Sequence, residues 1–217
     1  METFKLFSNE HFILIISNIL FFTFLLFIAN FFNKRYFAKI SAITIFILKL
    51  AELTYRHLYN NEEIFQLLPL HLCNITLIFV IIMMLSGSKT LFQLCFYWSL
   101  GAIFAIATPD VKYSFPNFMT LSFFTTHFYI LFAVVYAYIF FKFRPTFWGY
   151  FTAFFVINLI CLGVYFLNDS LENVRPEILL GGMSASICVL MDVDTSCRLM
   201  EMDCRFCNTL PNRSDSV

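Results

Sequence analysis

The sequence predicts an all-α protein, a polytopic transmembrane helix bundle with six clear spans and a short or altered seventh. Two features of the sequence support this prediction. Hydrophobic residues make up 60% of the chain and charged residues only 13%, far from the balance of a soluble globular domain. The apolar residues also fall in long runs, and a run of roughly 20 such residues can cross a hydrocarbon core about 30 Å thick.

Six apolar runs qualify as spans, and turn or stop signals separate them. The runs cover residues 11–32, 38–59, 69–85, 90–107, 118–141 and 147–167. The breaks contain paired charges, glycine or proline, which end helices: Lys34-Arg35, Glu62-Glu63, Gly87, Pro109 and Arg144-Pro145. The first run is long and follows the acidic Glu2 and Glu10, so we interpret it as a transmembrane helix rather than a cleavable signal peptide.

Composition changes near Gly181 and divides the chain into two parts. Of the 31 phenylalanines only Phe206 lies beyond this point, whereas four of the 7 cysteines do. The run 178–191 is short for a span, and Asp192 and Asp194 end it. We therefore expect residues 1–180 to form the bundle, and residues 181–217 to be a short apolar segment with a divergent, disordered tail.

The apolar composition indicates membrane lipids as partners, and the charge gives no support for nucleic acid. The chain has 14 basic and 14 acidic residues and no net charge, so it lacks a polybasic surface.

The first, third and fifth predicted loops carry basic residues without acids: Lys34, Arg35, Lys39, Lys89, Lys142 and Arg144. By the positive-inside rule the N-terminus of this multi-pass membrane protein then lies outside.

The few polar side chains inside the predicted spans are the candidates for function, because such groups are costly in lipid and usually mark a site. They are Lys49 and Glu52 in the second span, His71, Cys73 and Asn74 in the third, and Ser122, Thr125, Thr126 and His127 in the fifth. The outer ends of these three spans lie on the same side, so the depth of each residue can be counted from them at about 1.5 Å per residue. This count places five of the residues in one layer in the outer half of the membrane: Lys49, Glu52, His71, Cys73 and His127. The sequence therefore predicts a polar pocket built by three helices.

Cys73 and His127 are the candidate nucleophile and base. Pro69 favours a helix start, which places Cys73 near free backbone N–H groups. His71 is two residues away, about 200° around a regular helix, so it should face elsewhere, whereas His127 comes from another helix. Plainer roles stay open, since Cys73 could be a packing residue, His127 a hydrogen-bonded strut, and Lys49 with Glu52 a structural ion pair.

Other titratable residues have no assigned chemistry. His11 and His57 lie at predicted helix ends and are interpreted as interfacial. Cys204 and Cys207 have the spacing of a zinc or redox pair, but no second ligand pair accompanies them. We therefore expect no metal site and no cofactor.

One stretch, Leu68-Pro69-Leu70-His71-Leu72-Cys73, with the later Thr126-His127, Arg144-Pro145 and Asn158, resembles the YwaF-like family of bacterial integral membrane proteins. That family is distantly similar to an animal multispanning acyltransferase that makes ether phospholipids through a cysteine acyl-thioester. The resemblance covers approximately residues 10–180 and implies seven helices, a bacterial inner membrane, and Cys73 and His127 as the catalytic pair. The chain departs from the family at Val164, where an Asn is usual, and lacks its Trp- and Pro-containing seventh helix.

Three functions follow as expectations. The first is a cysteine-dependent acyltransferase that moves a fatty acyl chain between phospholipids, with His71, Asn74, Lys49 and Glu52 as binding or supporting residues. The second is a small transporter with a Lys49, Glu52 and His127 site. The third is a non-enzymatic membrane scaffold, for which the polar layer only fixes helix packing.

Overall fold

A computed structural model describes residues 4–59, 72–109, 111 and 113–172, with side chains up to residue 163. These residues form six helices and no β-strand: α1 (Asn9–Ala29), α2 (Lys34–Tyr59), α3 (Leu72–Ser86), α4 (Lys89–Ala107), α5 (Phe118–Phe140) and α6 (Phe147–Glu172). Each predicted run corresponds to one helix, which confirms the all-α fold. Pro69, His71, the expected seventh segment, the expected tail and the Cys204–Cys207 pair lie outside the described residues.

Short polar side chains define where helices begin. Ser88 Oγ accepts a hydrogen bond from the Leu91 N–H, and Asn117 Oδ1 accepts one from the Met119 N–H, as expected for helix N-caps. Asn33 Oδ1 likewise accepts from the N–H groups of Arg35 and Tyr36. Helix α2 therefore starts at Lys34, four residues before the predicted span, because Asn33 caps it there.

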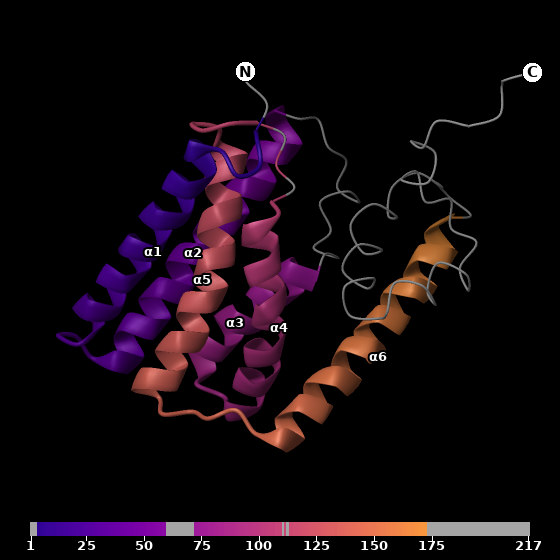
Figure 1. Ribbon diagram of the computed structural model, residues 1–217. Helices are drawn as coiled ribbons and strands as arrows, with labels where there is room; N and C mark the ends of the chain where they lie inside the picture. Colours follow the sequence, from indigo (N-terminus) through magenta and orange to yellow (C-terminus); the bar gives the residue numbers. More distant parts are fainter. Residues whose placement is uncertain (1–3, 60–71, 110, 112, 173–217) are drawn as a thin grey trace, which may run out of the picture.

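Helix α5 lies at the centre of the bundle (Figure 1). It packs against α1, α2, α3 and α4, and it buries residues on more than one face, from Thr120 to Ala137. Helices that follow one another run in opposite directions, and the described turn between α3 and α4 is the short pair Gly87-Ser88. Residues far apart in sequence, on α2, α3 and α5, are thereby brought together.

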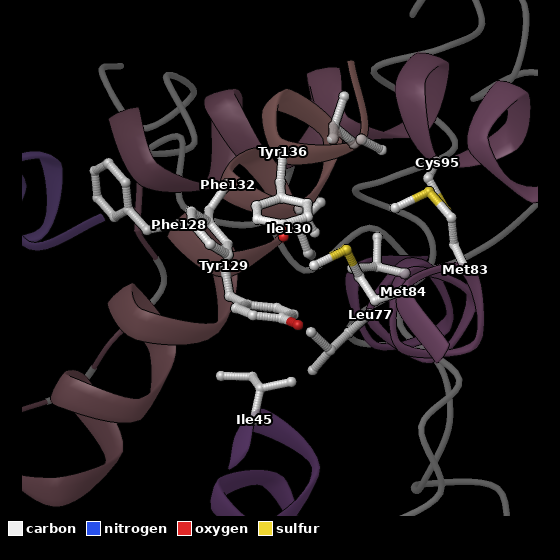
Figure 2. Packing of buried hydrophobic residues seen from close by; sticks show 14 of the residues in the cluster. Ile45, Leu77, Met83, Met84, Cys95, Phe128, Tyr129, Ile130, Phe132 and Tyr136 are labelled. Atoms are coloured by element: carbon white, nitrogen blue, oxygen red, sulfur yellow. The ribbon is translucent and has the colours of Figure 1, made fainter. Parts of the chain in front are cut away.

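Small residues allow α2 and α5 to pack closely. Ala38 and Ala42 on α2 and Ala133 and Ala137 on α5 are fully buried, one turn apart on each helix. Small residues at this spacing favour helix association in lipid, where packing and hydrogen bonds replace the hydrophobic effect. Figure 2 shows part of the surrounding core, where side chains from several helices meet: Ile45, Leu77, Met84, Tyr129 and Phe132.

Helix α6 is attached to the rest of the bundle through α4 (Figure 1). Leu94 and Trp98 of α4 pack with Ala153 and Ile157 of α6, and Trp98 Nε1 donates a 3.3 Å hydrogen bond to the Ala153 carbonyl. The other described side chains between Phe147 and Gly163 are largely exposed, and many of them are aromatic, for example Phe155. An exposed face that is this apolar is expected to contact lipid rather than water.

Three of the described helices, α1, α4 and α5, are long and apolar enough to cross a membrane. Helix α3, with 15 described residues, and α6 over Phe147–Gly163 are apolar but shorter, and α2 contains charged residues along its length, Lys49 and Glu52 among them. That all six helices span the bilayer therefore stays a prediction, whereas several apolar helices in one bundle are established.

The predicted basic loops meet at one end of the bundle. Arg35 at the start of α2 donates a 3.3 Å hydrogen bond to the Ser86 carbonyl at the end of α3, and its guanidinium lies 4.7 Å from the ring centre of Phe141, after α5. The loops that follow α1, α3 and α5 are thus neighbours. Which side of a membrane this end faces stays a prediction.

Candidate functional site

A buried ion pair on α2 is the core of the candidate site. Lys49 Nζ donates a 2.7 Å hydrogen bond to Glu52 Oε1. The two residues are three positions apart, so they lie on the same face of the helix, as the sequence predicted. The side chains of both partners are largely inside the bundle, with exposures of 16% for Lys49 and 8% for Glu52.

The second carboxylate oxygen of Glu52 connects α2 to α5. Ser122 Oγ donates a 2.6 Å hydrogen bond to Glu52 Oε2, and both residues are buried. One turn later on α5, Thr126 Oγ1 donates to the Ser122 carbonyl at 2.8 Å. The carboxylate therefore has a partner at each oxygen, which a buried charge requires.

Cys73 lies at the start of α3 beside this ion pair. It is the second described residue of the helix, a free cysteine that is half-buried, and Lys49 is close enough to interact electrostatically with its thiol. Helix packing explains the proximity, since α2 and α3 are in contact along the bundle. The structure therefore places Cys73 near Lys49, and a catalytic role for Cys73 stays a prediction.

His127 reaches the same ion pair from α5. Its ring is buried and interacts electrostatically with both Lys49 and Glu52. His127 Nδ1 lies 2.7 Å from the Phe123 carbonyl oxygen, which can only accept, so Nδ1 carries the proton. In the neutral ring Nε2 then carries the unprotonated lone pair, which no other described residue contacts by a hydrogen bond, and this is the arrangement that a general base needs.

The other predicted site residues contribute less. Asn74 follows Cys73 on α3 and is half-buried, and His71 lies outside the described residues. Over the described part of the chain, no group of three or more His, Cys, Asp and Glu side chains could hold a metal ion. The described site is therefore a set of organic side chains from α2, α3 and α5.

The sequence predicted an interfacial His11, whereas in the structure its side chain is almost fully buried. Its Nε2 donates a 2.9 Å hydrogen bond to the Ile106 carbonyl at the end of α4, and its Nδ1 accepts a 3.3 Å bond from the Phe7 N–H. The ring also packs edge-on against Phe4. With both nitrogens bonded, His11 fastens the N-terminal segment to α4.

The sequence marks Ser122 as a polar residue of the fifth span without assigning it a role, and the structure shows that it bonds to Glu52. It was one of several hydroxyl residues on the fifth run, and its role depends on the register between α2 and α5, which one sequence does not contain. A signal was nevertheless present: a buried carboxylate must find two partners, and Ser122 and Thr126 form the polar stripe of α5, one turn apart.

The comparisons with known proteins identify the family and no individual relative. The TMEM164 family model matches residues 6–174, a stretch that includes Lys49, Glu52, Cys73, Ser122 and His127. This match does not test the resemblance to YwaF-like proteins and to their acyltransferase relative, which stays a prediction. No curated protein and no solved structure matches the chain. The chain belongs to the TMEM164 family, a family of membrane proteins.

Proposed function

We propose that this multi-pass membrane protein is an acyltransferase that moves a fatty acyl chain from one phospholipid to another through a thioester on Cys73. The single observation that supports the proposal is the convergence of Cys73 and His127, from separate helices, on the Lys49 and Glu52 ion pair. A thiol, a histidine with a free Nε2 and a partly buried charge are the parts of a cysteine nucleophile site.

The reaction has two halves. In the first, His127 Nε2 takes the Cys73 proton while Sγ attacks the ester carbonyl of a donor phospholipid. The tetrahedral intermediate then collapses, the ester C–O bond breaks, and the departing lysophospholipid oxygen takes the proton back from His127. In the second, a lysophospholipid hydroxyl gives its proton to His127 Nε2 while its oxygen attacks the thioester carbon. The C–Sγ bond then breaks, Cys73 Sγ takes the proton from His127, and a diacyl phospholipid is released.

The described side chains of Cys73 and His127 share Lys49 as a neighbour and make no hydrogen bond to each other. Catalytic pairs commonly close to hydrogen-bond distance only once substrate is bound. A site among apolar helices suits two lipid substrates, because both dissolve in the bilayer and because excluding water favours transfer to a lysolipid over hydrolysis.

The test is to map the acyl adduct. The purified protein in detergent is mixed with a phospholipid whose fatty acyl chain ends in an alkyne, and hydroxylamine-sensitive adducts are located by mass spectrometry. The proposal expects an adduct on Cys73 that disappears in Cys73→Ala and persists in Cys161→Ala, the matched control, since Cys161 is another half-buried cysteine. A folded protein without an adduct on Cys73 would point to a scaffold or a transporter instead.

The variant His127→Asn tests the role of His127 as a base separately from its hydrogen bond to the Phe123 carbonyl. Asn18 and Asn158 in this chain each donate a side-chain hydrogen bond to the carbonyl four residues earlier, which is the bond that His127 Nδ1 makes. Asn at position 127 can therefore keep the bond to Phe123 and lacks the free Nε2. Adduct formation should fall about 100-fold or more, the usual size of general base catalysis.

A further inference from the structure

Within the described part of the chain, the hydrogen bonds around Glu52 engage only one of the N–H donors of the Lys49 ammonium. Glu52 accepts from Lys49 at one oxygen and from Ser122 at the other. Lys49, in contrast, has three N–H donors, and among the described residues it donates a hydrogen bond to Glu52 alone. Lys49 is also the more exposed of the two residues, with a side-chain exposure of 16% against 8% for Glu52.

The direction in which Lys49 is held matters for chemistry at Cys73. Ser122 fixes Glu52 from α5, and Glu52 fixes the ammonium, so a chain of two hydrogen bonds of 2.6 and 2.7 Å positions one positive charge. That charge interacts with Cys73 on α3 and with His127 on α5. A preorganised donor beside a nucleophile is the arrangement that stabilises charge developing in an acyl-transfer transition state.

We propose that Lys49 is an oxyanion-binding residue for acyl transfer at Cys73, and that Glu52 and Ser122 are positioning residues that act through it. This inference rests on the proposed acyltransferase function. When Sγ bonds to the ester carbon, the carbonyl π electrons move to oxygen, and the Lys49 N–H groups bind the oxyanion. The electrons return to the C–O double bond as the ester bond to the lysolipid breaks, so the lysine neither gains nor loses a proton.

The rival explanation is an ion pair that only fixes α2 against α5. Two reactions of the same thiol separate the two explanations. Transfer of the alkyne acyl chain from phosphatidylcholine to Cys73 passes through an oxyanion, whereas alkylation of Cys73 by iodoacetamide does not. The ratio of the two rates at Cys73 therefore reports oxyanion binding, and changes in folding or in thiol reactivity affect both rates.

The variants are Lys49→Met, Lys49→Arg, Glu52→Gln and the pair Lys49→Met with Glu52→Gln. The double variant keeps the test valid if single variants fail to fold, because removing both charges leaves no unpaired ion. Lys39→Met is the matched control, since Lys39 is an exposed lysine on the same helix. Each variant is first checked for an intact monodisperse peak and an unfolding midpoint in detergent.

Oxyanion binding predicts that the acylation-to-alkylation ratio falls about 100-fold in the double variant, recovers partly in Lys49→Arg, and is unchanged in Lys39→Met. A ratio that stays at the wild-type value in the folded double variant would overturn the role of Lys49 and leave the acyltransferase proposal intact. A wild-type protein that is alkylated at Cys73 but never acylated would overturn the acyltransferase proposal itself, and the role of Lys49 with it.

Discussion

Ser122 on α5 donates a 2.6 Å hydrogen bond to Glu52 on α2, and both side chains are buried in the bundle. This bond joins the helix that contains the ion pair to the helix that contains His127. It also satisfies the carboxylate oxygen that Lys49 does not reach. The stability of the bundle and the geometry of the candidate site therefore depend on one polar contact.

Ser122→Ala should lower the free energy of unfolding by about 1–3 kcal/mol, because it leaves a buried charged acceptor without its donor. The unfolding midpoint in detergent measures the change. Thr44→Ala is the matched control, since Thr44 Oγ1 bonds only within its own helix, to the Ile40 carbonyl, at an exposed position. Equal midpoints for Ser122→Ala and Thr44→Ala would contradict the contact.

Glu52→Gln alone should be more destabilising than the double change of Glu52 to Gln and Lys49 to Met. Removing one partner leaves an uncompensated buried ammonium, which typically costs about 3–5 kcal/mol, whereas removing both is often close to neutral. A double-mutant cycle on unfolding midpoints measures the coupling. Additive effects of the two single changes would show that the pair is solvated rather than buried.

His11→Ala should destabilise the bundle without impairing chemistry at Cys73. The ring bonds to the Ile106 carbonyl and to the Phe7 N–H, so its loss removes the donor from a buried bond to Ile106 at a cost of about 1–3 kcal/mol. The check is a lowered unfolding midpoint together with an unchanged rate of Cys73 acylation per folded molecule. Ser17→Ala, which removes a bond within α1, serves as the control.

The helices and the ion pair could be predicted from the sequence because their determinants are local. Turn residues such as Gly87 and Pro145 mark breaks, and the three-residue spacing of Lys49 and Glu52 dictates that they share a face. Interhelical partners are not local. The bond of His11 to Ile106 joins residues 95 positions apart, and Ser122 meets Glu52 across 70, so both depend on packing register that a single sequence does not specify.

The multi-pass arrangement predicts two sets of accessible positions. In a background without native cysteines, cysteine at Asn33, Lys89 or Lys142 should react with a membrane-impermeant maleimide from one side, and cysteine at Lys5 or Tyr113 from the other. All five positions are exposed at the ends of described helices or in adjoining turns. Labelling of Asn33 and Lys89 from opposite sides would contradict the shared basic end.

The most direct test of the central claim is a chase of the acylated protein. Protein carrying an alkyne acyl chain is separated from free lipid and mixed with a lysophospholipid, and the acyl chain is followed by mass spectrometry. Transfer through a thioester predicts that the acyl chain leaves Cys73 and appears in a diacyl phospholipid, at least about 100-fold more slowly in His127→Asn. An adduct on Cys73 that lysophospholipid leaves untouched would contradict it.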